Sequence, residues 1–187
     1  AFSDYKEALE QPGLQAVIVA TTHKSLAPIT MYAIELGLPV LVEKPAGIKS
    51  VEIDAVAKRA KEKKVVVKVG YNHRFHPAFQ KARQMVRNGD IGKVYYVRAA
   101  YGHGGRLGYD KEWRAKPELS GGGELIDQGS HLIDLSHALL GYFSGVDGRL
   151  MTYFWDMPVE DNAFLTLSTT RGQVAFLHAS WTQWKNY

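Results

Sequence analysis

Residues 39–69 read PVLVEKPAGIKSVEIDAVAKRAKEKKVVVKV, and this stretch decides the fold. Two short apolar runs, Pro39–Val42 and Val65–Val69, are rich in β-branched residues, which is typical of strands buried in a parallel sheet. Between them we expect a helix that Ser50 caps and that ends near Lys63. A strand, a helix and a second strand in this order predict a right-handed crossover between two parallel strands.

The same alternation extends toward the N-terminus. Gln15–Ala20 (QAVIVA) is another β-branched run, which we expect to be a strand buried on both faces. The apolar residues of Ser25–Leu36 predict a helix that Gly37 ends, and Phe2–Glu10 is expected to be a helix leading into this strand. Alternating strands and helices are typical of a doubly wound α/β sheet, so the chain is expected to begin in the middle of such a domain.

The pattern changes after Gly70, and we expect a domain boundary near residues 70–76. Helices are expected over Pro77–Arg87 and from the glycine triplet Gly121–Gly123 to about Leu140, and strands over Lys93–Tyr101, Asp147–Trp155, Ala163–Thr170 and Gln173–Thr182. Consecutive short strands without intervening helices predict antiparallel pairing. The second part of the chain is therefore expected to be an α+β domain with a mostly antiparallel sheet.

Composition excludes several classes of function. The 187 residues include no cysteine, which rules out disulfides and thiolate chemistry and fits a reducing compartment such as the cytoplasm. No run approaches the roughly 20 apolar residues of a membrane span, and the first residues do not resemble a signal peptide. The net charge is +4, but the local basic run Lys58–Lys64 lies where it complements the end of a helix. We therefore expect a cytoplasmic protein that binds neither nucleic acid nor membranes.

The first group of candidate residues is Glu43-Lys44-Pro45, directly after a predicted buried strand. Ligands of open parallel sheets bind beyond the carboxyl ends of the strands, so these side chains are expected to face a crevice. The alternative is an exposed turn with a surface ion pair. The proline also makes a cis peptide bond possible.

The second group lies on the helix after the glycine triplet. At about 100° per residue, Asp127, His131 and Asp134 share one face of a regular helix, and Gly129 leaves room for a substrate or a backbone to approach. The alternative is a helix whose acids favour the dipole and whose His131 is a core residue. A zinc site from His131, Asp134 and His137 is geometrically possible but lacks a fourth ligand, so we expect no metal.

The third group is Gly70-Tyr71-Asn72-His73-Arg74-Phe75-His76-Pro77, directly after the predicted third strand of the first domain. Polar and aromatic side chains in this position could line the same crevice or lie on the surface.

Taken together, these segments resemble the Gfo/Idh/MocA family, the relatives of glucose-fructose oxidoreductase and inositol dehydrogenase. The matching segments are Ala16–Thr21, Glu43–Pro45, Gly70–Phe75, Trp113–Arg114 and Gly121–Gly123 with Asp127–His131. The Glu-Lys-Pro segment with the Asp-x-Gly-x-His helix is a specific combination. The resemblance implies that residues 1–72 are the C-terminal portion of a Rossmann domain, and that residues 73–187 are an incomplete substrate and oligomerisation domain.

The resemblance also implies roles for individual residues. Lys44 would contact the nicotinamide region and the reacting hydroxyl, His131 would remove or return the hydroxyl proton, and Asp127 would orient the substrate or tune the other two. These roles agree with the residue chemistry, because histidine titrates near neutrality and an ammonium favours a developing alkoxide. The implied cofactor neighbours are Thr21, Thr22, His23, Glu43, Lys44, Pro45, Trp113 and Arg114, and the implied substrate neighbours are Tyr71, Asn72 and Arg74. His73 stands where the family frequently has arginine, and Thr22 where it commonly has proline.

No G-x-G-x-x-G segment occurs in the chain, although the family carries one on an earlier strand. We therefore expect the parent protein to extend beyond both Ala1 and Tyr187. The predicted function is hydride transfer between NAD or NADP and a secondary alcohol of a sugar, polyol or nucleotide-linked sugar, in a homo-oligomer that is a dimer or tetramer when complete. Two alternatives are a redox-inactive relative that binds a sugar or dinucleotide, and an NAD-assisted glycoside hydrolase.

Overall fold

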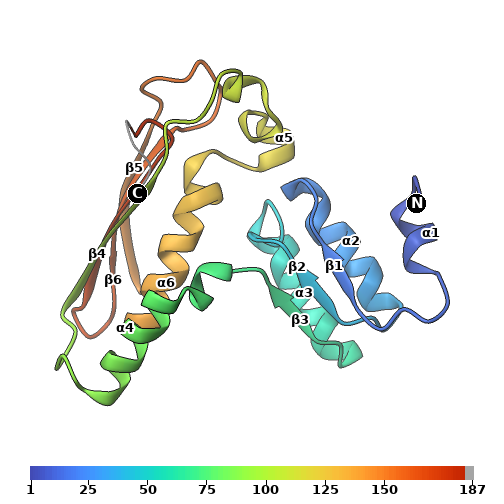
Figure 1. Ribbon diagram of the computed structural model, residues 1–187, viewed down its shortest axis with the longest axis horizontal. Coiled ribbons are helices and arrows are strands. Elements are labelled where there is room, and N and C mark those ends of the chain that lie inside the picture. Colours follow the sequence, from blue (N-terminus) through green and yellow to red (C-terminus); the bar gives the residue numbers. More distant parts are fainter. Residues whose placement is uncertain (184–187) are drawn as a thin grey trace. The chain divides into compact units, whose positions relative to one another are not determined.

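The computed structural model describes residues 1–183, which form two compact units. Residues 1–70 and 118–121 make up the first unit, and residues 71–117 and 122–183 make up the second (Figure 1). The elements of the first unit are α1 (Tyr5–Leu9), β1 (Val17–Val19), α2 (His23–Glu35), β2 (Val40–Val42), α3 (Ser50–Lys63) and β3 (Val67–Val69), and the short α5 (Pro117–Ser120) ends in it. No helix within residues 1–183 has the length and apolar character needed to cross a membrane.

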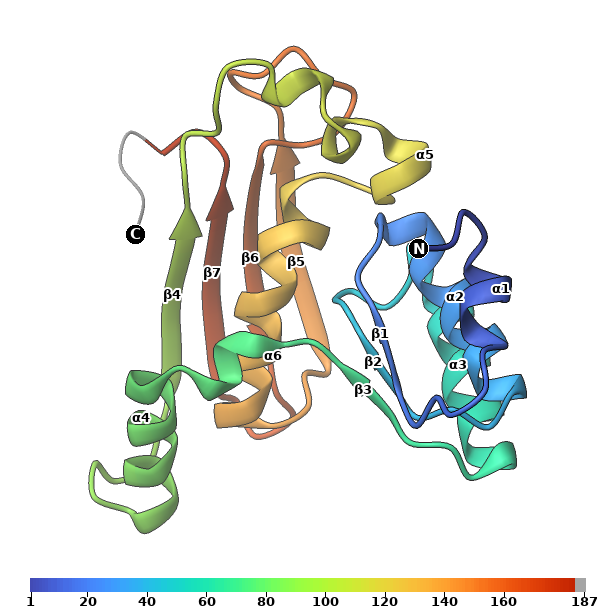
Figure 2. The ribbon, with the colours of Figure 1, turned by 45° about the vertical axis from the view of Figure 1, so that its right-hand side comes forward.

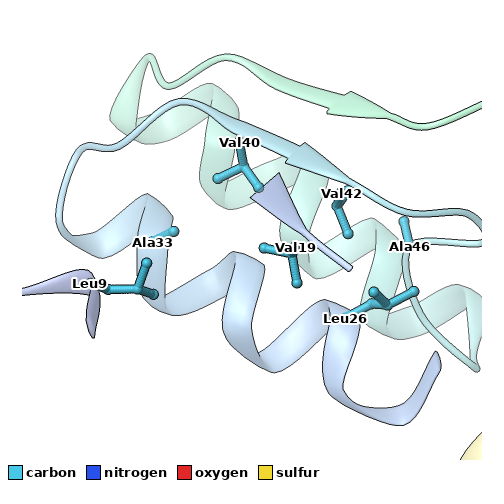
Figure 3. Packing of buried hydrophobic residues seen from close by; sticks show 7 residues of the cluster. All are labelled: Leu9, Val19, Leu26, Ala33, Val40, Val42 and Ala46. Carbon is cyan, nitrogen blue, oxygen red and sulfur yellow. The ribbon is translucent and has the colours of Figure 1, made fainter. Parts of the chain in front are cut away.

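The first unit contains a three-stranded parallel sheet in the order β1-β2-β3, as the alternation of strands and helices predicted. Its core forms where Val19 and Val42 of neighbouring strands pack with Leu26 and Ala33 of α2 (Figure 3). Leu9 of α1 joins the same cluster. The helices α2 and α3 pack on each other through Ala27, Ile34, Val56 and Ala60.

Two expectations for the first unit were wrong. Ile18, in the middle of β1, is 75% exposed and pairs in register with Leu41 of β2, which is 44% exposed. Successive side chains of a strand point to opposite faces, so the described residues cover one face of this sheet and leave the other open. Ser50 is the first residue of α3 and does not cap it; the carboxylate of Glu52 accepts hydrogen bonds from the backbone N–H groups of Ile48 and Lys49.

The second unit contains a four-stranded sheet in the order β4-β7-β6-β5. Its elements are η1 (Asn72–Phe75), α4 (Pro77–Asn88), β4 (Tyr96–Gly102), η2 (Tyr109–Lys111), η3 (Trp113–Ala115), η4 (Leu125–Gly129), α6 (Ser130–Leu140), β5 (Gly145–Met151), β6 (Asn162–Ser168) and β7 (Val174–Ser180). The β5–β6 and β6–β7 pairs are antiparallel and the β4–β7 pair is parallel, which confirms the mostly antiparallel sheet. Figure 2 shows α6 along one face of this sheet, where Leu132 and Leu140 pack on Ala175 and Leu177 of β7.

The helix expected after the glycine triplet begins as a π-helical turn, η4, and continues as α6. Such turns are rare and occur frequently at functional sites. A Cβ on Gly129 would lie 3.1 Å from Cδ1 of Leu125 and 3.7 Å from Cβ of Ala179 on β7. The space at Gly129 is therefore filled by Leu125 and by Ala179 of the sheet. It does not leave room for a substrate, which was one of the two possibilities that the sequence suggested.

Candidate active site

In the first unit, candidate residues follow adjacent strands of the parallel sheet. The backbone N–H of Glu43 donates to the carbonyl of Val19 (2.9 Å), and that of Gly70 donates to the carbonyl of Val42 (2.7 Å), so the strands end side by side. Glu43 is exposed, Lys44 is half-buried and Pro45 is buried, and the Lys44–Pro45 peptide bond is cis. The Glu43-Lys44-Pro45 turn thus lies at the carboxyl edge of the sheet, where open α/β sheets bind their ligands.

The start of α2 lies at the same edge. Thr22 is the N-cap residue of α2, and the hydroxyl of the exposed Thr21 donates to the carbonyl of Thr22 (3.2 Å). The His23 ring is only 4% exposed, and its Nδ1 lies 2.8 Å from the carbonyl oxygen of Ser120. His23 therefore joins residues 118–121 to the start of α2, a structural contact that the sequence did not predict.

This edge has the chemistry to meet the nicotinamide end of a dinucleotide. The Lys44 ammonium is a donor, and the Thr21 hydroxyl oxygen and the Glu43 carboxylate are acceptors, which are the groups that a carboxamide and a ribose require. The 187 residues contain no G-x-G-x-x-G loop, so none of them forms the usual cradle for the dinucleotide phosphates. The side chains at this edge therefore match the nicotinamide end of a dinucleotide and not its phosphates.

In the second unit, His131 of α6 is only 7% exposed and is surrounded by aromatic rings. The His73 ring stacks on it, with centroids 4.0 Å apart and planes at 14°. Tyr71 meets the His131 ring edge-on at 5.8 Å, and Tyr101 of β4 does so at 6.3 Å. An imidazole held in this way has a fixed orientation, which a proton-transfer group requires.

Asp127 of η4, also 7% exposed, is paired with an arginine. Nε of Arg114 donates to Oδ2 of Asp127 (3.1 Å), and the guanidinium lies 4.6 Å from the ring centroid of Trp113. Trp113 and Arg114 belong to η3, so this contact connects the expected Trp-Arg segment to the Asp127 carboxylate.

Burial and the charge of Asp127 affect the titratable side chains of this region. Burial raises the pKa of Tyr101, and the negative charges of Asp127 and Glu124 raise it further. Burial also raises the pKa of Tyr109, which Asp127 reinforces, and burial raises the pKa of Tyr71, which Asp134 reinforces. These tyrosines remain protonated at neutral pH, so each hydroxyl retains a hydrogen-bond donor.

Arg74 has a partner on α6. Its Nε donates to Oδ2 of Asp134 (2.6 Å) and its Nη2 donates to Oδ1 (2.5 Å), while the Asp134 side chain is 8% exposed. The hydrogen bonds to Asp134 raise the pKa of Arg74. This two-bond pair attaches η1, which carries His73, to the helix that carries His131.

The predicted residues are divided between the units. Thr21, Thr22, His23, Glu43, Lys44 and Pro45 belong to the first unit, and Tyr71, Asn72, Arg74, Trp113, Arg114, Asp127 and His131 belong to the second. Within the second unit the structure brings Tyr71 to His131 and Arg114 to Asp127, whereas Arg74 pairs with Asp134 and Asn72 is exposed. Across residues 1–183, no group of three or more histidine or acidic side chains is arranged to hold a metal ion.

The sequence did not single out His73 and Tyr101 as ring neighbours of His131. His73 belongs to the segment Gly70–Pro77, which the sequence marked as a candidate site. The only sign that His73 was unusual was that the family frequently has arginine at this position. Tyr101 lies near the end of β4, thirty positions before His131, and no local pattern connects the two.

Comparison with known proteins identifies the family of the chain. Residues 1–71 match the family model described as an oxidoreductase family with an NAD-binding Rossmann fold, and residues 79–187 match the GFO/IDH/MocA C-terminal domain. The chain is 30% identical to levoglucosan dehydrogenase of Pseudarthrobacter phenanthrenivorans over 91% of its length, covering 44% of that protein. It is 33% identical to the NAD-dependent scyllo-inositol 2-dehydrogenase of Bacillus subtilis over 74% of its length, covering 39% of that protein.

Solved structures agree. A levoglucosan dehydrogenase in complex with NADH and levoglucosan superposes on the whole chain with a TM-score of 0.92 at 27% identity. The chain covers 53% of that structure, so it spans about half the length of the relatives it matches.

Proposed function

Because the chain belongs to the GFO/IDH/MocA family of oxidoreductases, we propose that it is part of an NAD(P)-dependent dehydrogenase that moves a hydride to or from a secondary alcohol. The proposed substrate class is a sugar, a polyol or a nucleotide-linked sugar. The observation that carries the proposal is the buried His131, stacked on His73 and bordered by Tyr71 and Tyr101. The named relatives act on a sugar derivative and on an inositol, which supports this substrate class.

In the proposed reaction, His131 takes the proton of the substrate hydroxyl during oxidation and returns it during reduction, since an imidazole exchanges protons near neutral pH. A bound nicotinamide supplies the hydride acceptor or donor. The ammonium of Lys44 favours the developing alkoxide. Asp127, held by Arg114, orients the substrate or tunes its neighbours, and the protonated hydroxyls of Tyr71 and Tyr101 donate hydrogen bonds to further substrate hydroxyls.

The remaining predicted residues have proposed roles in binding the cofactor, in supporting the site or in binding the substrate. Residues 1–72 form the dinucleotide-binding portion, in which Thr21, Thr22, Glu43, Lys44 and Pro45 contact the nicotinamide end. His23 contributes by fixing the start of α2 through Ser120. In the substrate-binding portion, residues 73–187, Trp113 and Arg114 act through Asp127. Asn72, which is exposed, remains a proposed substrate neighbour, and Arg74 attaches η1 to α6 through Asp134.

The test uses the full-length enzyme with NAD and with NADP against a panel of polyols, aldoses and nucleotide sugars. Reduced nicotinamide, followed by its absorbance, is expected to form in proportion to the alcohol consumed with at least one compound. Binding of cofactor without turnover of any compound would favour the redox-inactive alternative. Release of sugar from glycosides without net cofactor reduction would favour glycoside hydrolysis.

We also propose that the enzyme is a homo-oligomer through the face of the β4–β7 sheet opposite α6. One row across this face contains Arg98, Phe176, Thr166 and Asp147, which are neighbours in register on four strands. Phe176 is 47% exposed, and Phe164 in the next row is 37% exposed. The arginine and the aspartate lie on the two outer strands, so a two-fold axis in the plane of the interface and parallel to the strands would place each beside the other residue type of a second copy.

Light scattering tests this surface. We expect Phe176→Glu to lower the molar mass of the full-length enzyme, because it places a carboxylate in the apolar centre of the face. The matched control is Tyr142→Glu, an equally drastic change at an 87% exposed aromatic residue outside the sheet. Equal masses for wild type and Phe176→Glu would contradict the proposal.

The proposed location is the cytoplasm. It rests on the lack of cysteine in the 187 residues, which fits a reducing compartment. Fractionation of cells that express the full-length protein tests it.

A further inference from the structure

Glu160, in the connection between β5 and β6, binds the turn at which the helix carrying Asp127 and His131 begins. Its Oε2 accepts a hydrogen bond from the backbone N–H of Gly123 (3.0 Å), and its Oε1 accepts one from that of Leu125 (3.0 Å). Its backbone carbonyl accepts a third from the N–H of Glu124 (2.9 Å). One residue thus satisfies three consecutive N–H groups at the start of a helix, and its carboxylate lies where the helix dipole favours a negative charge.

The glycine at position 123 allows this approach. A Cβ on Gly123 would lie 2.0 Å from the carbonyl oxygen of Glu160 and 2.8 Å from its backbone nitrogen. The third position of the glycine triplet therefore requires a residue without a Cβ, because the backbone of the β5–β6 connection comes close to it.

The residue after Glu160 is firmly held. Asp161 is fully buried, and its carboxylate accepts hydrogen bonds from the backbone N–H groups of Tyr153 (2.9 Å), Phe154 (2.8 Å) and Trp155 (3.1 Å). Its carbonyl accepts a hydrogen bond from the N–H of Trp181 (2.8 Å). Glu160 therefore extends from a fixed segment of backbone, and the position of its carboxylate is set by the sheet.

A direct chain of hydrogen bonds runs from Glu160 to Asp127. The N–H of Gly123 donates to the Glu160 carboxylate, and the carbonyl of Gly123 accepts from the N–H of Asp127 (3.1 Å). The N–H of Gly123 is thus bonded to Glu160, and its carbonyl is bonded to Asp127. A shift of the glycine turn would move Asp127 relative to Arg114, its partner on η3.

We propose that Glu160 is a positioning residue: its carboxylate fixes the glycine turn and thereby places Asp127 and the following helix for the reaction. This inference rests on the proposed function, since it assumes that Asp127 and His131 act on the substrate. Glu160 itself touches neither the substrate nor the cofactor in this account. Its effect is on geometry, and small displacements of reacting groups have large effects on rate.

The experiment compares Glu160→Ala, Glu160→Gln and Thr152→Val in the full-length enzyme. Thr152 is the matched control because its hydroxyl donates to the carbonyl of Val159 (3.1 Å) in the same connection without touching the glycine turn. We expect kcat to fall about 10- to 100-fold in Glu160→Ala with the KM for the cofactor unchanged. The kcat of Glu160→Gln, which keeps one acceptor oxygen, is expected to lie between those of wild type and Glu160→Ala. The kcat of Thr152→Val is expected to stay near that of wild type.

Hydrogen exchange of the backbone amides supplies a readout independent of turnover. In Glu160→Ala the amides of Gly123, Glu124, Leu125 and Asp127 are expected to exchange faster than in wild type, and in Thr152→Val they are expected to remain protected. If Glu160→Ala does not fold, Glu160→Gln decides both readouts. A kcat within twofold of wild type in the folded Glu160 variants, or an equal loss in Thr152→Val, would overturn the proposal. An inactive wild-type enzyme would instead defeat the proposed function, and the exchange measurement would still test the contact.

Discussion

Arg74 shows how a single side chain can have two competing interpretations. Its place after the third strand predicted a substrate contact, but in the structure its guanidinium makes two hydrogen bonds to Asp134. The Asp134 side chain is 8% exposed and the Arg74 side chain is 39% exposed. Loss of the ion pair would therefore cost more at Asp134 than at Arg74, because the Asp134 carboxylate would be left buried without a counter-charge.

We expect Arg74→Met to lower the free energy of unfolding by about 1–3 kcal/mol, because the Asp134 carboxylate loses two charge-assisted hydrogen bonds. The exposure of Arg74 keeps the loss below that for a fully buried pair. Denaturant unfolding of Arg74→Met, Asp134→Asn and the double variant measures the coupling between the two side chains. A higher substrate KM in Arg74→Met without loss of stability would instead support the substrate contact predicted from the sequence.

At the residue scale, the sequence predicted groups whose chemistry is local. Lys44 follows a buried strand, and Asp127 and His131 share one helical segment, so position and spacing made them candidates, and the family resemblance supplied their expected roles. The ring neighbours His73 and Tyr101 and the carboxylate of Glu160 come from other elements of the chain. Only tertiary packing brings these groups together, so no spacing rule could identify them.

At the scale of elements, the beginning of the helix that carries His131 is irregular. The glycine turn, the π-helical turn η4 and the close approach of Glu160 all occur within a few residues. A regular helix was predicted there because apolar periodicity cannot distinguish one widened turn. The parallel pairing of β4 with β7 also escaped prediction, since these strands are far apart in the chain.

Gly123→Ala tests the close approach. The added methyl group would meet the backbone of Glu160, which cannot move without disturbing the sheet, so we expect a loss of about 3 kcal/mol or more. Gly122→Ala is the matched control, because its Cβ would meet the Ile126 side chain alone, with Cγ2 at an ordinary 3.4 Å and Cβ at 3.9 Å. We expect the control to change stability by less than about 1 kcal/mol. Equal stabilities of the two variants would contradict the packing described.

The carboxyl group of Asp161, in the β5–β6 connection, is expected to make the stability of the protein depend on pH in the acid range. Burial acts to raise its pKa, but the hydrogen bonds from Asn162 and from the backbone N–H groups of residues 153–155 outweigh burial and lower it. A lowered folded pKa contributes stability above the unfolded value of about 3.9, and this contribution is lost as the pH falls through the folded pKa.

We therefore expect Asp161→Asn to be less stable than wild type at neutral pH by about 1–3 kcal/mol, and to lose less stability on acidification below about pH 4. Denaturant unfolding at several pH values measures both effects. Asp156→Asn, a change at an exposed carboxyl in the same connection, is the control. A parallel pH dependence of wild type and Asp161→Asn would show that Asp161 does not contribute.

At the scale of the whole molecule, the first unit has one apolar face that the described residues leave open. Ile18 and Leu41 are neighbours on this face. A parallel sheet of the doubly wound class is usually covered on both faces, and the chain spans about half the length of its relatives. The missing dinucleotide phosphate loop predicted the partial length, whereas the continuous apolar strands had predicted a sheet buried on both faces.

We expect the 187-residue chain, prepared alone, to bind a hydrophobic fluorescent dye, because exposed apolar patches of this kind attract such dyes. The double variant Ile18→Lys/Leu41→Gln is expected to bind less dye, and the full-length enzyme to bind little. The control is Leu107→Gln, a change at a fully exposed leucine in the second unit. Equal dye binding by the double variant and the 187-residue chain would show that this face is not the exposed apolar surface.

In the proposed reaction, His131 exchanges the proton of the reacting hydroxyl. The most direct measurement is kcat/KM for alcohol oxidation by full-length wild type and His131→Asn, with the cofactor affinity of each variant determined alongside. We predict that His131→Asn lowers kcat/KM by about 10²- to 10⁴-fold, the usual contribution of a general base, with unchanged cofactor affinity. An unchanged kcat/KM in His131→Asn would show that His131 does not exchange this proton.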